Sequence, residues 1–171
     1  MLCGRNVFER QKRGLLVGKT TRGQGTKLLV LVDGAGTPLG LHVDAASPSE
    51  VGLLVQTLET GRVCRPHQRG RPRTRPDRLI ADKGYDSNAA RALLEQRGIA
   101  PIIPARENNT VATHQDGRVL RRDRRRWIVE RTIGWLQNFR RLTTRWDRSA
   151  AVYTALVHLA CALIVLKRLS G

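Results

Sequence analysis

The segment KLLVLVDGAGTPLGLHVD, residues 27–44, carries the clearest fold signal in the chain. It opens with a continuous apolar run, KLLVLV at residues 27–32, and TPLGLHV at residues 37–43 resembles a returning strand. Between them, Asp33-Gly34-Ala35-Gly36 has the composition of a tight turn. Residues 27–44 therefore predict a β-hairpin.

The sequence after this hairpin predicts an alternation of helices and short strands. Ser47-Pro48-Ser49-Glu50 is typical of a helix start, with Ser47 as the cap and proline at the first helical position. The further predicted elements are a helix ending near Gly61, a strand over 79–81, a helix over 88–97, an edge strand over 99–104 and helices over about 121–144 and 150–169. This order predicts one mixed α/β layer domain over residues 1–171.

The charge balance points to a polyanionic partner. The 171 residues include 31 Lys plus Arg against 14 Asp plus Glu, a formal net charge of +17, and Arg outnumbers Lys by 26 to 5. Arginine favours forked contacts with phosphate, so nucleic acid is the expected partner class. The residues expected to contact DNA are Lys19, Lys27, Arg71, Arg73, Arg75, Arg121, Arg122, Arg124 and Arg125.

Cysteine spacing and apolar run length exclude several other classes of protein. Cys3, Cys64 and Cys161 stand far apart with no C-x-x-C pair, which argues against a disulfide framework or a zinc ribbon and favours the reducing cytoplasm. The apolar run over residues 150–166 has 17 residues, fewer than the ~20 needed to span a bilayer. A buried helix is therefore expected there, and no membrane partner.

One candidate catalytic carboxylate lies at the end of a predicted strand. Asp82 follows the strand over 79–81 and precedes the turn Lys83-Gly84-Tyr85, and open α/β sheets keep their sites at the carboxyl ends of strands. The alternative interpretation is structural: Asp82 begins a turn and Asp86 caps the following helix.

A second candidate lies within the arginine-rich helix. Arg126, Glu130 and Gly134 are four residues apart and share one helix face, and a glycine on that face permits close approach of another backbone or a substrate. The alternative is an ordinary surface ion pair between Arg126 and Glu130, worth only ~0.5 kcal/mol.

Taken together, these segments resemble bacterial insertion-sequence transposases of the DDE class, in the groups numbered four and five. The resemblance covers the chain from about residue 14 to its C-terminus, with the motifs in order and at fitting spacings. The matching segments are VGKTTRGQGTKLLVLVDGAGTPLG (17–40), ASPSE (46–50), RPDRLIADKGYDS (75–87), RRWIVERTIGWLQNFRRL (125–142) and the final helix. ADKGYD followed by R-x-x-x-E is the specific combination.

The resemblance implies a ribonuclease H-like fold, a mixed sheet flanked by helices, in which three acidic residues hold two Mg²⁺ ions. By motif, Asp82 matches the second acid and Glu130 the third, and Arg126 matches a basic residue that contacts phosphate. Two such ions, ~3.5–4 Å apart, activate water or a 3′-hydroxyl for in-line displacement. The implied reaction is metal-dependent strand cleavage at the ends of the element, followed by strand transfer to target DNA.

The sequence departs from this family pattern at its beginning. Cys3 or Gly4 stands in the place of the first acid, and no aspartate precedes Asp33. We therefore expect the opening strand to be degenerate or missing, the amino-terminal DNA-binding region to be absent, and the chain to be inactive alone. The alternative is a non-catalytic DNA-binding regulator or a transposase remnant. Expected partners are transposon-end and target DNA, and a second copy or the upstream half of a split transposase.

Overall fold

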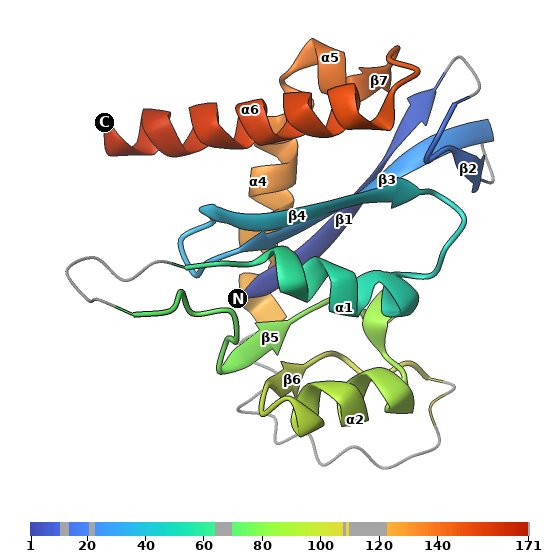
Figure 1. Cartoon of the computed structure of the whole chain (residues 1–171). Helices are drawn as coiled ribbons and strands as arrows, with labels where there is room; N and C mark the ends of the chain where they lie inside the picture. The colour runs from blue at the N-terminus through green and yellow to red at the C-terminus, as the bar shows by residue number, and fades with distance from the viewer. Residues whose placement is uncertain (11–13, 21–22, 64–69, 108, 110–122, 171) are drawn as a thin grey trace.

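The computed structural model describes residues 1–10, 14–20, 23–63, 70–107, 109 and 123–170, which form a mixed sheet with helices on both faces (Figure 1). The strands are β1 Leu2–Arg10, β2 Gly18–Thr20, β3 Gly23–Val32, β4 Pro38–Ala45, β5 Arg78–Ile80, β6 Ala100–Ile102 and β7 Thr144–Arg145. The helices are α1 Glu50–Thr60, α2 Asn88–Gln96, α4 Trp127–Gln137, α5 Arg140–Thr143 and α6 Ala150–Leu169, with short 3₁₀ turns η1 Lys83–Tyr85 and η2 Asp123–Arg126. This architecture is compatible with a ribonuclease H-like fold.

Strand β1 lies in the middle of the sheet. It pairs antiparallel with β3 from Leu2 to Glu9 and parallel with β5, where Leu2 lies opposite Ile80. The expectation that the opening strand is degenerate or missing is therefore wrong. A strand needs only its backbone hydrogen bonds and apolar side chains such as Leu2, which is buried, and neither depends on a catalytic acid.

The predicted hairpin and edge strand are confirmed. β3 and β4 pair antiparallel, from Thr26 opposite Ala45 to Val32 opposite Pro38. In the turn between them the Asp33 carboxylate accepts hydrogen bonds from the backbone amides two and four residues further on. β6 pairs parallel with β5 at the end of the strand order β2-β3-β1-β5-β6, as its prolines predicted.

The sheet separates two apolar cores. On one face Leu2, Val30 and Ile80 pack with residues of α4 and α6. On the other face Cys3, Leu29 and their neighbours pack with α1 and α2. Because successive strand residues point to opposite faces and both faces are covered, every residue from 28 to 32 is buried. This burial explains why the sequence there is a continuous apolar run.

The helices differ from prediction in two places. Ser49, rather than Ser47, caps α1, because its hydroxyl accepts from the Gly52 amide. The single helix predicted over 121–144 is instead divided: α4 ends at Gln137, Phe139 is extended, and α5 is followed by β7. This break lets residues 144–145 pair with the far end of β1.

Arg145 of β7 is a fully buried cation that the sequence analysis did not single out. Its guanidinium donates to the carbonyls of Leu15 (2.9 Å) and Leu16 (3.1 Å) and to the Thr26 hydroxyl (2.6 Å). It also lies over the Tyr153 ring, 5.1 Å from its centroid. Arg145 thus fixes the segment before β2 to the core under α6.

Candidate active site

The three residues that the family resemblance assigns to the site, Asp82, Arg126 and Glu130, lie close together at one end of the sheet. Arg126 Nη1 lies 3.2 Å from Asp82 Oδ1, although the two residues are 44 positions apart. Arg126 Nε lies 4.0 Å from Glu130 Oε1, one helical turn along the chain. The side chains of Asp82 and Glu130 are 49% and 67% exposed, so both carboxylates face solvent and are open to a substrate.

Local structure accounts for the position of Asp82. The residue follows the carboxyl end of β5 and begins η1, and its carbonyl accepts from the Tyr85 amide. Side chains alternate along the strand, so Asp82 shares the sheet face of Ile80, toward α4. Arg126 closes η2 directly before α4, which places its guanidinium across from Asp82.

A glycine lies beside the two carboxylates and the arginine of this site. A cavity of about 130 Å³ borders Asp82, Arg126 and Glu130, and both Cys3 and Gly4 line it. Gly4 faces α4, on the same side as Asp82, whereas Cys3 packs in the core on the other face. Of the two residues that the resemblance offers for the first acid's place, Gly4 is therefore the one that lies on the same side of the sheet as Asp82.

Helix α4 packs directly on Gly4. A Cβ at this position would lie 2.6 Å from Val129 Cγ2 and 3.0 Å from Ile133 Cδ1. Real Cβ atoms do not approach as closely as 2.6 Å, so a side chain at position 4 requires Val129, or α4 with it, to shift. Apolar side chains of α4 thus fill the space beside Gly4.

Cys3 offers no anionic ligand to the site. Burial raises the pKa of the Cys3 thiol to about 11, although its hydrogen bond to the Tyr85 hydroxyl, 3.4 Å away, acts in the opposite direction. Burial likewise raises the pKa of Tyr85. Both groups are therefore neutral near pH 7 and form part of the core beside the site.

Sequence comparison decides the family. Residues 10–165 match the family described as "Transposase DDE domain". The chain belongs to this family. A relative from Burkholderia cepacia, named "Putative transposase for insertion sequence element IS402", is 37% identical over 140 residues, which cover 82% of this chain and 62% of the relative. The chain thus spans less than two thirds of the length of the curated relative that it matches.

The donor set of this DDE domain does not fit the metal centre of its family, which generally uses a divalent metal. Among the residues that the structure describes, no group of three or more His, Cys, Asp or Glu side chains is placed to hold a metal ion. Asp82 and Glu130 supply carboxylate oxygens of the kind that Mg²⁺ prefers, but Gly4 supplies none. The Arg126 cation also lies within hydrogen-bond distance of Asp82.

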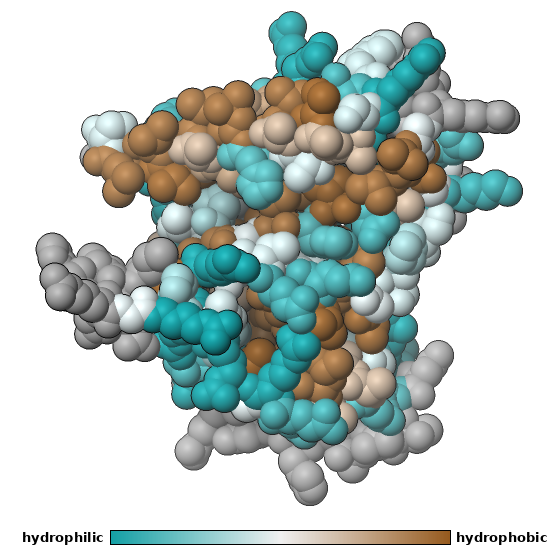
Figure 2. All heavy atoms as spheres, in the orientation of Figure 1, coloured by the Kyte–Doolittle hydropathy of each residue, from teal (hydrophilic) through white to brown (hydrophobic). Residues whose placement is uncertain are grey.

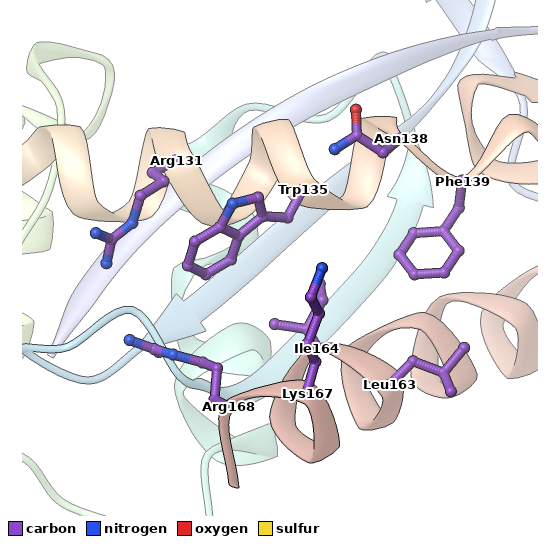
Figure 3. Close-up of a pocket in the computed structure, with 8 residues that line it drawn as sticks. All are labelled: Arg131, Trp135, Asn138, Phe139, Leu163, Ile164, Lys167 and Arg168. Atoms are coloured by element: carbon purple, nitrogen blue, oxygen red, sulfur yellow. The ribbon is translucent and has the colours of Figure 1, made fainter. Parts of the chain in front are cut away.

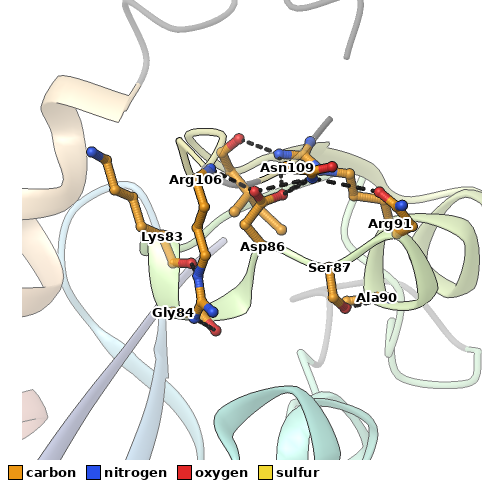
Figure 4. Close-up of polar contacts among 10 residues, drawn as sticks. Lys83, Gly84, Asp86, Ser87, Ala90, Arg91, Arg106 and Asn109 are labelled. Carbon is orange, nitrogen blue, oxygen red and sulfur yellow. Dashed lines mark hydrogen bonds and ion pairs between the residues drawn. The ribbon is translucent and has the colours of Figure 1, made fainter. Parts of the chain in front are cut away.

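A buried polar network holds the turn that carries Asp82 (Figure 4). The Asp86 carboxylate accepts from Arg91 Nε (2.9 Å), the Arg106 amide (2.6 Å) and Asn109 Nδ2 (3.2 Å). The Arg106 guanidinium in turn donates to two carbonyls of η1, at residues 83 and 84, at 2.8 and 2.9 Å. Asp86 is therefore not the cap of α2, which is Ser87, but the centre of a clamp on η1.

Hydrogen bonding outweighs burial in setting the acidity of Asp86. Burial by itself raises the pKa of this carboxyl. The hydrogen bonds from the Arg106 amide, Asn109 and Arg91, together with the Arg91 charge, favour the carboxylate and hold the pKa below its ordinary value. Local spacing does not predict this network, because its members come from two separate stretches of the chain, residues 83–91 and 106–109.

Lys27 does not fit the DNA-binding role predicted for it. The residue is 4% exposed, and its ammonium donates to the Pro48 carbonyl and lies 3.0 Å from Glu50 Oε1. Arg5 Nη1 binds the same Glu50 oxygen at 2.6 Å. Glu50, in the first turn of α1, thus pairs with two cations beside the site, and the buried Lys27 ammonium is not available to a phosphate.

The remaining residues predicted to contact DNA lie on the surface wherever they are described. Arg73 forms an ion pair with the exposed Asp77, and Arg75 donates to the Arg97 carbonyl at 3.3 Å. Arg121, Arg122 and the side chain of Arg124 lie outside the described residues. The exposed members of the set are Lys19, Arg71, Arg73, Arg75 and Arg125.

A larger cavity, of about 590 Å³, lies between α4 and α6 and is separate from the acidic site (Figure 3). Arg131 lies over the rings of Trp127 and Trp135, 4.8 Å from each centroid, and Arg168 lies 5.4 Å from that of Trp135. Both guanidinium groups also donate to the Ala35 carbonyl in the β3–β4 turn. These cations therefore tie the turn to both helices.

Proposed function

We propose that this chain acts in DNA transposition as a DDE transposase core that binds DNA and does not by itself cleave it. The observation that carries the proposal is the site at the end of β5, where Asp82, Arg126 and Glu130 converge beside Gly4, which has no side-chain oxygen. Membership of the family supports transposition in general. The substrate proposed is the DNA of insertion-sequence ends and target, in the bacterial cytoplasm.

The lack of cleavage follows from the position of Gly4. Metal-dependent phosphoryl transfer needs enough oxygen ligands to fix the ions against attacking and leaving oxygens. The site offers two exposed carboxylates, both paired with Arg126, and the third side-chain oxygen ligand that the ions would need is missing among the described residues. Loss of one member of such a unit removes most of the rate, because the members act together.

Binding to DNA rests on charge rather than on a shaped groove. The formal charge of +17 and the exposed arginines at 71, 73 and 75 provide cations that can take the place of the counterions around DNA phosphates. Because the released counterions return to solution, we expect affinity for duplex DNA to fall steeply with salt. Contacts of this kind depend little on base sequence.

Fluorescence anisotropy with a labelled duplex, titrated at several salt concentrations, tests the binding. In the variant with Arg71, Arg73 and Arg75 replaced by Gln, affinity falls less steeply with salt. The magnitude of the slope of log affinity against log salt decreases by about one for each phosphate that the variant no longer neutralises. Lys27→Met is the matched control, since the Lys27 ammonium is buried against Glu50 and the Pro48 carbonyl and does not reach a phosphate, and it leaves the slope unchanged. A weak slope in the unaltered chain contradicts DNA binding through phosphates.

Strand cleavage is tested separately, with a duplex carrying an insertion-sequence end and Mg²⁺ present. We expect no Mg²⁺-dependent product from the unaltered chain at concentrations that saturate binding. If the unaltered chain forms product and Asp82→Ala does not, two carboxylates suffice for cleavage. That outcome refutes this part of the proposal without affecting the binding result.

A further inference from the structure

Helix α6 is apolar on two sides, and only one of them is covered. The inner side packs in the core through Tyr153, Val157, Ala160, Cys161 and Ile164. The outer side exposes a second apolar row, visible as brown spheres along α6 in Figure 2. Contiguous apolar surface of this kind marks an interaction site. The members of this outer row are Val152, Ala155, Leu159, Ala162, Leu166 and Leu169, all of them exposed.

The spacing of the outer row is that of a helix–helix seam. Its members follow one another at steps of three, four, three, four and three residues, the repeat that keeps one stripe facing a partner helix. In a chain of net charge +17, residues 150–166 contain no Asp, Glu, Lys or Arg. The row is therefore a place where two copies of this cationic chain can approach without placing like charges in contact.

Large and small side chains alternate along the row from Val152 to Leu166, and this alternation selects one arrangement. In an antiparallel pair of identical helices, Leu159 lies opposite Ala162, Ala155 opposite Leu166 and Val152 opposite Leu169. Every large side chain except those of the terminal pair then faces an alanine, so that the layers interdigitate. In a parallel pair Leu159 meets its own copy and Ala162 meets its own copy, which leaves voids between the alanines.

We propose that the outer row of α6 is a homodimer interface, in which a second copy of the chain packs its own α6 antiparallel across a twofold axis. The axis passes between Leu159 and Ala162, and each copy presents the same surface, as an isologous interface requires. The antiparallel arrangement also keeps the cations Lys167 and Arg168 of the two copies at opposite ends of the interface. All six positions of the row pair in this single register.

A lipid bilayer is the competing occupant. By length and composition α6 is long and apolar enough to cross a membrane, but its inner side is packed on the sheet. Arg168 near its C-terminus is held by Trp135 and by the Ala35 carbonyl, 2.7 Å away. These contacts would have to break for lipid to surround the helix, whereas a second α6 needs only the outer side.

Sedimentation velocity tests the proposal. The chain is treated with nuclease and measured in about 0.5 M NaCl, where the Debye length is only a few ångströms and repulsion between the cationic chains is screened. We expect a dimer. Leu159→Glu places a carboxylate in the seam and raises the dissociation constant at least ~100-fold, with an unchanged circular dichroism spectrum. Ala155→Leu fills the space that Leu166 of the second copy needs and also weakens the dimer. The same change at the exposed Ala92 of α2, Ala92→Leu, leaves it intact.

The orientation is tested by the distance between nitroxide labels on Ala151→Cys in a Cys64→Ser background. At 1.5 Å per residue, antiparallel helices in this register hold the two labels about 28 Å apart along the axis, and parallel helices hold them side by side. A chain that is monomeric at about 100 µM, where a Kd in the micromolar range or below gives a dimer, overturns the proposal. So does a dimer that survives Leu159→Glu, or labels side by side. A monomer that floats with phosphatidylglycerol vesicles overturns it in favour of the bilayer.

Discussion

Replacing Asp86 by Asn tests the clamp on the turn that carries Asp82. The Asp86 side chain is fully buried and the Arg91 side chain is 11% exposed, with Arg91 Nη2 2.8 Å from Asp86 Oδ1. Asn keeps the shape but removes the charge and one of the two acceptor oxygens. The Arg91 guanidinium then stays buried without its counter-ion, a change that costs about 3–5 kcal/mol.

Urea unfolding followed by circular dichroism measures this loss. With a slope of about 2 kcal/mol per molar urea, the midpoint falls by about 2 M. Glu59→Gln is the matched control, because it breaks an ion pair of the same chemistry in which both side chains are exposed. In that pair Arg97 Nη2 lies 3.5 Å from Glu59 Oε1. That control costs less than about 1 kcal/mol. Equal small shifts in the two variants refute the reasoning that burial makes the Asp86 pair special.

The same network predicts how stability depends on pH. Because the pKa of Asp86 is lower in the folded chain than its ordinary value, its contribution to stability is complete above the unfolded pKa of about 3.9. The contribution is lost as pH falls through the folded pKa. Urea midpoints measured over the acid range, from about pH 6 down to about pH 2, decline less steeply in Asp86→Asn than in the unaltered chain. Parallel declines contradict the assignment.

Three further substitutions test other parts of the site and core. Gly4→Ala costs about 1–3 kcal/mol by overpacking against α4, and Val129→Ala in the same chain recovers part of that loss, which a double-mutant cycle in urea detects. Arg145→Gln removes hydrogen bonds to the segment before β2 and costs at least about 2 kcal/mol, measured as a lower thermal midpoint. Asp82→Asn changes the free energy of unfolding by less than about 1 kcal/mol, because its pair with Arg126 is partly exposed; a larger change shows a structural role.

Local patterns in the sequence were sufficient for most elements of the fold. The hairpin of β3 and β4, the edge strand β6 and the helices α2 and α6 follow from apolar runs, turn residues and caps that act over a few residues. The division of the predicted long helix was not accessible in this way. Its apolar spacing continues through Phe139, but α4 ends at Gln137 and Phe139 is extended, and after α5 residues 144–145 pair with β1.

Part of the candidate site could likewise be predicted from local sequence motifs, and part could not. Short, contiguous motifs were enough to single out Asp82, Arg126 and Glu130 as the residues of interest. The folded arrangement was needed to show that Gly4 rather than Cys3 lies on their side of the sheet, and that Lys27 is buried in a pair with an acid of α1. The same holds for the clamp on the turn after β5, whose members meet only in three dimensions. The physical reason is that these facts depend on which sheet face a side chain takes and on charges brought together from distant segments, and neither is encoded in local spacing.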